Sequence, residues 1–364
     1  MRRSCRDRLF LAFIAILALY IVWYVFNSTP HIIRDPAEEQ AYLHAISGSL
    51  PMIQNVQLCS LDQVDILILI VSSGSHFLER QSIRETWGSM PDMFDVHSQC
   101  LFVIGYQDGE NLYRDILSEA QHQQDILYLT VDDNSMTMKE LYAYRWLEKY
   151  CPNVTFTFKT EDDLFVNTFL LHELVRELKT NPEQHLNRHL YNISLETIFL
   201  ARTNHDVRGF LFGWAFQPGK PERNESNAPY YVSNQEYPKE LYPRYCSGFG
   251  YLMDLKTRKL LVSEGFKEKE PFRFSDIFIT GMLPERMNFI CDVLPFTYNQ
   301  GTTDQCISVI KQSYRRNTST LIPPLFVCST GRHVALSTFS DYYRIWTALK
   351  YVYGDRTEPK RNMP

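Results

Sequence analysis

The order of apolar and polar residues along the chain predicts strands that alternate with helices. Near-continuous apolar runs, typical of parallel strands buried on both faces, occupy 65–71, 101–105 and 125–129. Apolar residues at helical spacing occupy 77–87, 110–123, 135–150, 169–178 and 255–264. This alternation predicts an α/β domain with a largely parallel sheet.

A further strand is predicted at 154–160, where apolar and polar residues alternate, and an acidic triplet follows it directly. Ligands of parallel sheets bind at the carboxyl ends of the strands, which is where Glu161, Asp162 and Asp163 lie. Three adjacent carboxylates repel one another, and their oxygens suit a hard divalent cation such as Mg²⁺ or Mn²⁺. Such a metal attracts phosphate, so the triplet indicates an enzyme for a nucleotide-linked substrate. The alternative is a solvated acidic loop.

The N-terminus carries an apolar run of eighteen residues, 9–26, which contains no charge. Four arginines precede it, and aromatic residues stand near its far end. This pattern predicts an uncleaved signal anchor with the N-terminus in the cytosol. A cleaved signal peptide or a buried core helix would be the alternatives. The predicted organisation is a cytosolic tail, a transmembrane anchor, a stem, a lumenal catalytic domain and a C-terminal tail, at 1–8, 9–26, 27–61, 62–350 and 351–364.

Sequons and cysteines fit the secretory pathway. Of the Asn-x-Ser/Thr sequons beyond the anchor, the candidate glycosylation sites are Asn192, Asn224 and Asn317. The cysteines beyond the anchor are odd in number, so at least one thiol is free or pairs between chains. Apolar residues make up 45% of the 364 residues, which excludes global disorder, and the net charge of -5 shows no nucleic-acid footprint.

Several separate segments resemble the β-1,3-galactosyltransferase family, which also contains β-1,3-N-acetylglucosaminyltransferases and is a glycosyltransferase family 31 type. Residues 80–88 resemble its R-x-x-I-R-x-T-W-G signature, and 159–167 resemble its K-x-D/E-D-D-x-F/V-V-N block. Residues 242–251 resemble its YPPYCSGxGY block, and 137–151 look like its LTLKT…W…C region. The segments occur in the family order between 65 and 281.

The resemblance implies a GT-A glycosyltransferase fold and a single-pass type II protein of the Golgi membrane. It also implies Mn²⁺ and an inverting transfer from a UDP-sugar to the 3-hydroxyl of an acceptor glycan on a glycoprotein or glycolipid. UDP-galactose is the expected donor. N-acetylglucosamine and N-acetylgalactosamine stay open as donor sugars.

The resemblance also assigns roles to acidic residues. Asp163 would bind the metal, with Glu161 as a further ligand, while Asp162 would help to bind the donor. Asp276 would be the catalytic base that accepts the proton of the acceptor hydroxyl. Its alternative role is the N-cap of a helix that begins at Ile277.

The remaining candidates have weaker signals. His333 is a candidate metal ligand, and a surface histidine is the alternative. Arg80 and Arg84 lie four residues apart, so they could clamp the diphosphate or pair with carboxylates inside the fold. Lys159 could meet phosphate or balance the triplet. Two glycines, Gly248 and Gly250, would let the chain approach the donor closely or would simply form a turn.

The sequence departs from the family in the E/D-D-V-x-x-G block. Ser275 stands where the first acid would be, and Thr280 occupies the glycine position, with Gly281 one residue later. A catalytically inactive, glycosyltransferase-like chaperone or glycan-binding subunit is therefore the competing hypothesis. The intact triplet and Asp276 favour the enzyme.

Overall fold

The computed structural model describes residues 53–59, 64–89, 95–179, 189–190, 193–194, 209–227, 229–313, 322–330 and 338–357. Contacts divide the chain into one unit at 1–48 and another at 49–364. The described residues include neither the predicted cytosolic tail at 1–8 nor the predicted anchor at 9–26. Most of the predicted stem at 27–61 also lies outside them. Among the helices that are described, none is both long and apolar enough to cross a membrane.

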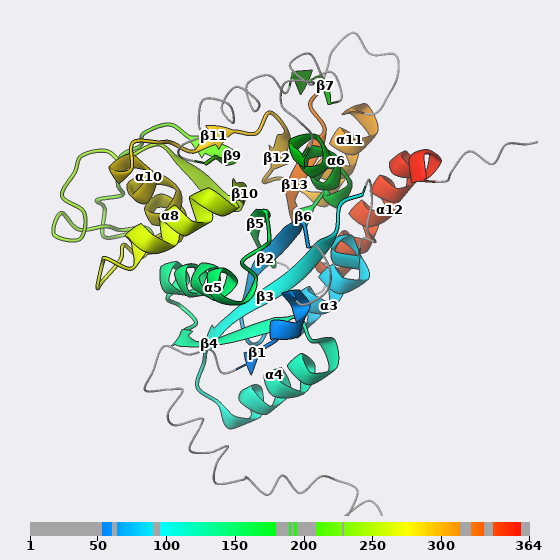
Figure 1. The fold of residues 1–364 in the computed structure, drawn as a ribbon. Coiled ribbons are helices and arrows are strands. Elements are labelled where there is room, and N and C mark those ends of the chain that lie inside the picture. Colours follow the sequence, from blue (N-terminus) through cyan, green and yellow to red (C-terminus); the bar gives the residue numbers. More distant parts are fainter. Residues whose placement is uncertain are drawn as a thin grey trace, which may run out of the picture. The chain divides into compact units, whose positions relative to one another are not determined.

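The main sheet is mixed, and its centre is parallel. Its order in the described part of the chain is β1-β4-β3-β2-β5-β10-β9-β11 (Figure 1). The strands are β1 (Ile53–Gln54), β2 (Ile66–Ser72), β3 (Ser98–Tyr106), β4 (Ile126–Asp132), β5 (Phe156–Glu161), β9 (Leu211–Phe216), β10 (Tyr245–Asp254) and β11 (Asp292–Val293). The pairs among β4, β3, β2 and β5 are parallel, whereas β10 runs antiparallel to both β5 and β9. The predicted α/β domain with a largely parallel central sheet is confirmed.

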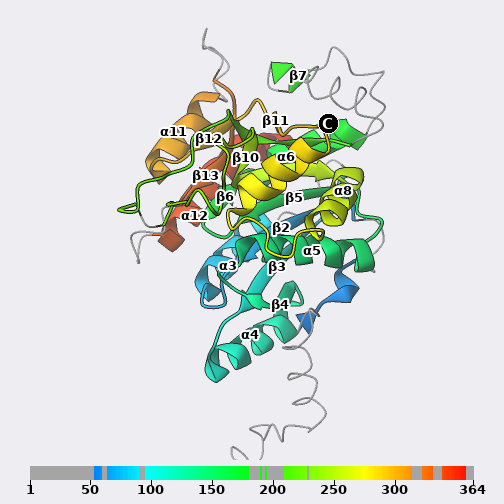
Figure 2. The same cartoon turned by 90° about the vertical axis from the view of Figure 1, so that its left-hand side faces the viewer.

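Helices cover both faces of this sheet because its central strands are apolar on both faces. In β2, every residue from Ile66 to Ser72 is buried, and alternate residues enter two different cores. One face packs against α3 (Phe77–Glu85), α4 (Glu110–Gln123), α6 (Thr168–Lys179) and α12 (Thr338–Thr357). The other face packs against α5 (Met136–Tyr150), α8 (Leu255–Gly265) and α10 (Leu283–Arg286), and Figure 2 shows α5 and α8 in front of the sheet.

A smaller sheet belongs to the same hydrophobic core as α3, α4, α6 and α12. Its order is β12-β13-β6, formed by β12 (Thr297–Asn299), β13 (Leu325–Ser329) and β6 (Leu164–Val166). Strand β6 follows the acidic triplet directly, so this sheet joins the C-terminal part of the chain to the end of β5. A disulfide between Cys306 and Cys328 links β13 to α11 (Thr303–Ser313).

The described cysteines confirm the prediction that at least one thiol beyond the anchor does not pair within the chain. Disulfides join Cys59 to Cys151, Cys246 to Cys291 and Cys306 to Cys328. Within the described residues, Cys100 is the free thiol. Burial raises the pKa of Cys100 to about 12, so this thiol stays protonated at neutral pH.

Candidate active site

The acidic triplet marks the point where the chain leaves the main sheet. Strand β5 ends at Glu161, Asp162 and Asp163 form the turn, and β6 begins at Leu164. The Asp162 carboxylate is fully buried, and its Oδ2 lies 2.9 Å from Nδ1 of His76. Glu161 and Asp163 are half-buried. The strand pattern therefore placed the triplet correctly, at the carboxyl edge of the parallel strands.

Lys159 lies beneath the triplet in a buried network of charges. Its Nζ is 3.1 Å from Glu140 of α5 and 3.1 Å from Glu161. The phenol of Tyr251 donates to Glu140 at 2.6 Å and lies 2.7 Å from the Tyr144 hydroxyl. Burial alone would lower the pKa of Lys159, but the two carboxylates outweigh it and hold that pKa above its ordinary value. Lys159 thus pairs with Glu161 of the triplet, while a contact of Lys159 with phosphate stays a prediction.

Strand β10 contains two glycines at places where a side chain would not fit. A Cβ on Gly248 would lie 2.8 Å from Oε1 of Glu161 and 3.5 Å from Nζ of Lys159. Gly250 has a φ of 156°, and a Cβ there would meet the Phe158 ring at 2.5 Å. Gly248 therefore borders the acidic site, whereas Gly250 packs against the core.

Asp276 lies in an element that packs against both α5 and β10, which contribute Glu140 and Tyr251 to this network. It lies in the short helix α9 (Ser275–Ile277), and its carboxylate accepts a 2.8 Å hydrogen bond from the backbone N–H of Ile277. Burial raises the pKa of Asp276 to about 6, with the Ile277 N–H and Lys159 lowering it and Glu140 and Glu161 raising it further. Asp276 is therefore within electrostatic range of Glu161 and Lys159.

The expectation that Asp276 could be an N-cap is wrong. The helix begins one residue earlier, at Ser275, and Phe274 is its N-cap residue. A π-helical turn, Phe278–Met282, follows. Within it, the Thr280 hydroxyl accepts a 2.8 Å hydrogen bond from the Cys246 N–H and lies 3.0 Å from the Cys246 carbonyl. Thr280 therefore ties the helix of Asp276 to β10.

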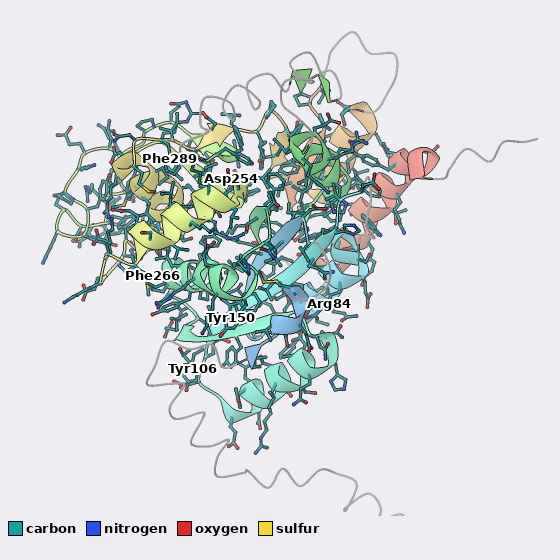
Figure 3. The ribbon with its side chains drawn as sticks, in the orientation of Figure 1. Arg84, Tyr106, Tyr150, Asp254, Phe266 and Phe289 are labelled. Carbon is teal, nitrogen blue, oxygen red and sulfur yellow. A yellow bond between two sulfur atoms is a disulfide. The ribbon has the colours of Figure 1, made fainter. Side chains whose placement is uncertain are left out.

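The two arginines of the first family-like segment pair with carboxylates in the fold. Arg80 is fully buried and binds Glu119 of α4, with its shortest contact at 2.6 Å. Arg84, labelled in Figure 3 on the α3 side, binds Asp125 through two hydrogen bonds of 2.7 and 2.8 Å and Glu119 at 2.7 Å. Burial opposes ionisation of Glu119, but both guanidinium groups outweigh it and lower its pKa. The two arginines therefore join α3 to α4 and to Asp125, the residue that precedes β4.

We expect Arg80→Met to lower the free energy of unfolding by about 3 kcal/mol, because it removes one partner of a buried ion pair. Urea unfolding measures this loss. Arg114→Met is the matched control on α4, since Arg114 and its partner Glu110 are more than half exposed, and its cost should stay below about 1 kcal/mol. An Arg80 variant that keeps its stability and loses affinity for UDP would instead show that Arg80 clamps the diphosphate.

Other predicted residues are only partly described. His333, Asn192 and Asn317 lie outside the described residues. Asn224 lies exposed in a loop, where its side-chain oxygen accepts a 3.1 Å hydrogen bond from the N–H of Ser226. Across the described ranges, the structure brings together no group of three or more His, Cys, Asp or Glu side chains that could hold a metal.

A polar cluster at the ends of β2, β3 and β4 was missed from the sequence. Asp133 is buried, and its carboxylate binds Lys139 at 2.8 Å, the hydroxyl of Ser73 at 2.7 Å and the amide of Gln107 at 2.9 Å. These residues come from four separate segments, so no local pattern joins them. Lys139 lies in the segment 137–151, which resembles a family region.

The chain resembles known proteins over about three quarters of its length. Residues 78–290 match the family model described as "Galactosyltransferase". The chain is 26% identical over 293 residues to the UDP-GalNAc:beta-1,3-N-acetylgalactosaminyltransferase 1 of Mus musculus, covering 74% of this chain and 75% of that protein. It is 27% identical over 277 residues to the human beta-1,3-galactosyltransferase 5, covering 75% and 76% of the two chains.

Proposed function

Because the chain belongs to the galactosyltransferase family, we propose that it is an inverting β-1,3-hexosyltransferase. It transfers a sugar from a UDP-sugar to the 3-hydroxyl of an acceptor glycan, with galactose as the first choice of donor sugar. The similar proteins named above act, by their names, as β-1,3-transferases of galactose and N-acetylgalactosamine. The observation that carries the proposal is that α9, which holds Asp276, packs against α5, whose Glu140 shares Lys159 with Glu161 of the triplet.

Asp276 is the base of the proposed reaction. As the acceptor oxygen forms its bond to the anomeric carbon, its proton passes to the Asp276 carboxylate, and the bond to the diphosphate breaks with its electron pair leaving on UDP. Attack and departure occur on opposite faces of the sugar, which explains inversion without a covalent intermediate. Cys246 does not act as a nucleophile, because it forms a disulfide with Cys291.

We propose that the acidic triplet binds the UDP-sugar donor. We also propose that the domain has a GT-A fold. Glu161 and Asp163 are the residues that would hold a manganese ion, because both are half-buried at the edge of the sheet and carry the hard carboxylate oxygens that this ion prefers. When bound there, the metal would supply positive charge to the departing diphosphate. Asp162 has a different position, since its carboxylate is buried against His76. The Golgi location, the type II anchor and the role of His333 stay predictions.

The direct test is a donor screen of the purified protein against UDP-galactose, UDP-N-acetylgalactosamine and UDP-N-acetylglucosamine, with manganese or with a chelator. Manganese-dependent transfer of a sugar to a glycan acceptor supports the proposal, and the preferred UDP-sugar identifies the sugar. A protein that binds UDP and transfers none of these sugars would be the inactive glycosyltransferase-like subunit instead.

The pKa of Asp276 sets an expected pH dependence. A base works only when ionised, so kcat/KM should be constant above the pKa and fall as the pH decreases through about 6. Initial rates at saturating manganese, measured between about pH 5 and 8, give this profile. A profile that stays flat down to about pH 5 would contradict the assignment of Asp276 as a base with a raised pKa.

A further inference from the structure

The backbone of the acidic triplet is held by residues from the C-terminal part of the chain. Strand β13 pairs antiparallel with β6, with Ser329 opposite Leu164, so the register brings the next residue, Thr330, to Asp163. Thr330 donates its N–H to the Asp163 carbonyl at 3.0 Å and its hydroxyl to the same oxygen at 2.7 Å. One residue therefore supplies two donors to one carbonyl.

A second side chain holds the neighbouring peptide. Tyr342 of α12 is fully buried, and its hydroxyl donates to the carbonyl of Asp162. Helix α12 is fixed in place by aromatic stacking, since Phe169 of α6 stacks on Trp346 and on Tyr353. The tyrosine hydroxyl therefore comes from a helix that packs against α6.

These contacts lie where the chain leaves the main sheet. Strand β5 ends at Glu161, and Asp162 and Asp163 form the turn to β6, so their carbonyls need other donors once water is excluded. Three donors meet these two carbonyls and fix both peptide planes. These two peptides flank Asp163, so they set the direction in which its carboxylate leaves the chain.

We propose that Thr330 and Tyr342 are positioning residues that orient the carboxylate of Asp163 toward the donor diphosphate. The inference rests on the proposed function. Both residues lie beyond 78–290, the range of the family model, whereas the carbonyls that they hold lie inside it. The C-terminal part of the chain is accordingly part of the donor site, not an appended module.

The test compares single-group variants of the full chain. Tyr342→Phe removes one hydroxyl, and Thr330→Val replaces a hydroxyl by a methyl group. We expect each to lower kcat/KM for the UDP-sugar by about ten- to a hundredfold, as small displacements of aligned groups do, while the KM for the acceptor stays unchanged. Both should also weaken UDP binding measured by calorimetry with manganese present.

Two controls separate positioning from stability. Tyr343→Phe changes the neighbouring tyrosine, whose hydroxyl bonds Glu85 on the surface, and should leave donor kinetics unchanged. Thr330→Ser keeps the hydroxyl and should restore kcat/KM to within about twofold of the natural protein. Unfolding curves give the folded fraction of every variant.

Each outcome decides the inference. Variants at Thr330 and Tyr342 that keep the donor kcat/KM and UDP affinity of Tyr343→Phe would overturn it, as would losses that only follow the folded fraction. If the natural protein binds UDP without transferring sugar, the proposed function fails, yet UDP affinities still decide whether these residues position Asp163. A natural protein without UDP affinity would overturn both.

Discussion

Asp276→Asn is expected to lower sugar transfer by about 10²–10⁴-fold, the range found when a general base is removed. The amide has nearly the same shape as the carboxylate and its oxygen can still accept the hydrogen bond of Ile277, but it cannot take up the proton of the acceptor. Transfer under saturating donor and acceptor measures the loss. The UDP affinity should stay within about threefold, because the base acts on the acceptor side.

The neighbouring serine is the control for this change. Ser275 is buried in the same short helix, and the family has an acid at its position. We expect Ser275→Ala to keep transfer within about fivefold, because a serine hydroxyl is too weak a base to replace a carboxylate. Asp276→Asn that retains more than about a tenth of the natural rate would remove Asp276 from the mechanism.

Local pattern was sufficient for the central strands and for most helices that cover them. The predicted helices at 110–123 and 135–150 correspond to α4 (Glu110–Gln123) and α5 (Met136–Tyr150). The apolar run at 65–71 corresponds to β2 (Ile66–Ser72). These elements were predictable because each has a single period over many residues, and burial on the sheet reinforces that period.

The site was predictable only in part, because its contacts join distant segments. The charges of Glu140 and Lys159 are buried as a pair, and nothing in either local pattern indicates this. The sequence predicts only that the glycines of β10 allow a close approach. It does not predict the strand itself, because a bulge between Cys246 and Tyr251 interrupts the alternation of a regular strand. Thr330 reaches Asp163 across a separation of 167 residues and gave no sequence signal.

Asp163→Asn should have the second large effect, because it removes a negative charge from the predicted metal site while preserving the shape of the side chain. We expect transfer to fall by at least about a hundredfold, since metal stabilisation of the leaving group is worth several kcal/mol. Calorimetry supplies a readout that is independent of turnover. Manganese should tighten UDP binding to the natural protein and should have little effect on the variant.

The control for charge alone is Glu110→Gln, which neutralises an exposed acid on α4 and should change neither transfer nor the manganese effect. Comparison with Asp162→Asn is also informative, because Asp162 is buried against His76 and Asp163 is half-buried at the sheet edge. If Asp162→Asn abolished the manganese effect and Asp163→Asn did not, the metal site would lie on the His76 side of the turn. Because the Asp162 carboxylate is already paired with His76, whereas Asp163 is half-buried, we expect the loss to follow Asp163.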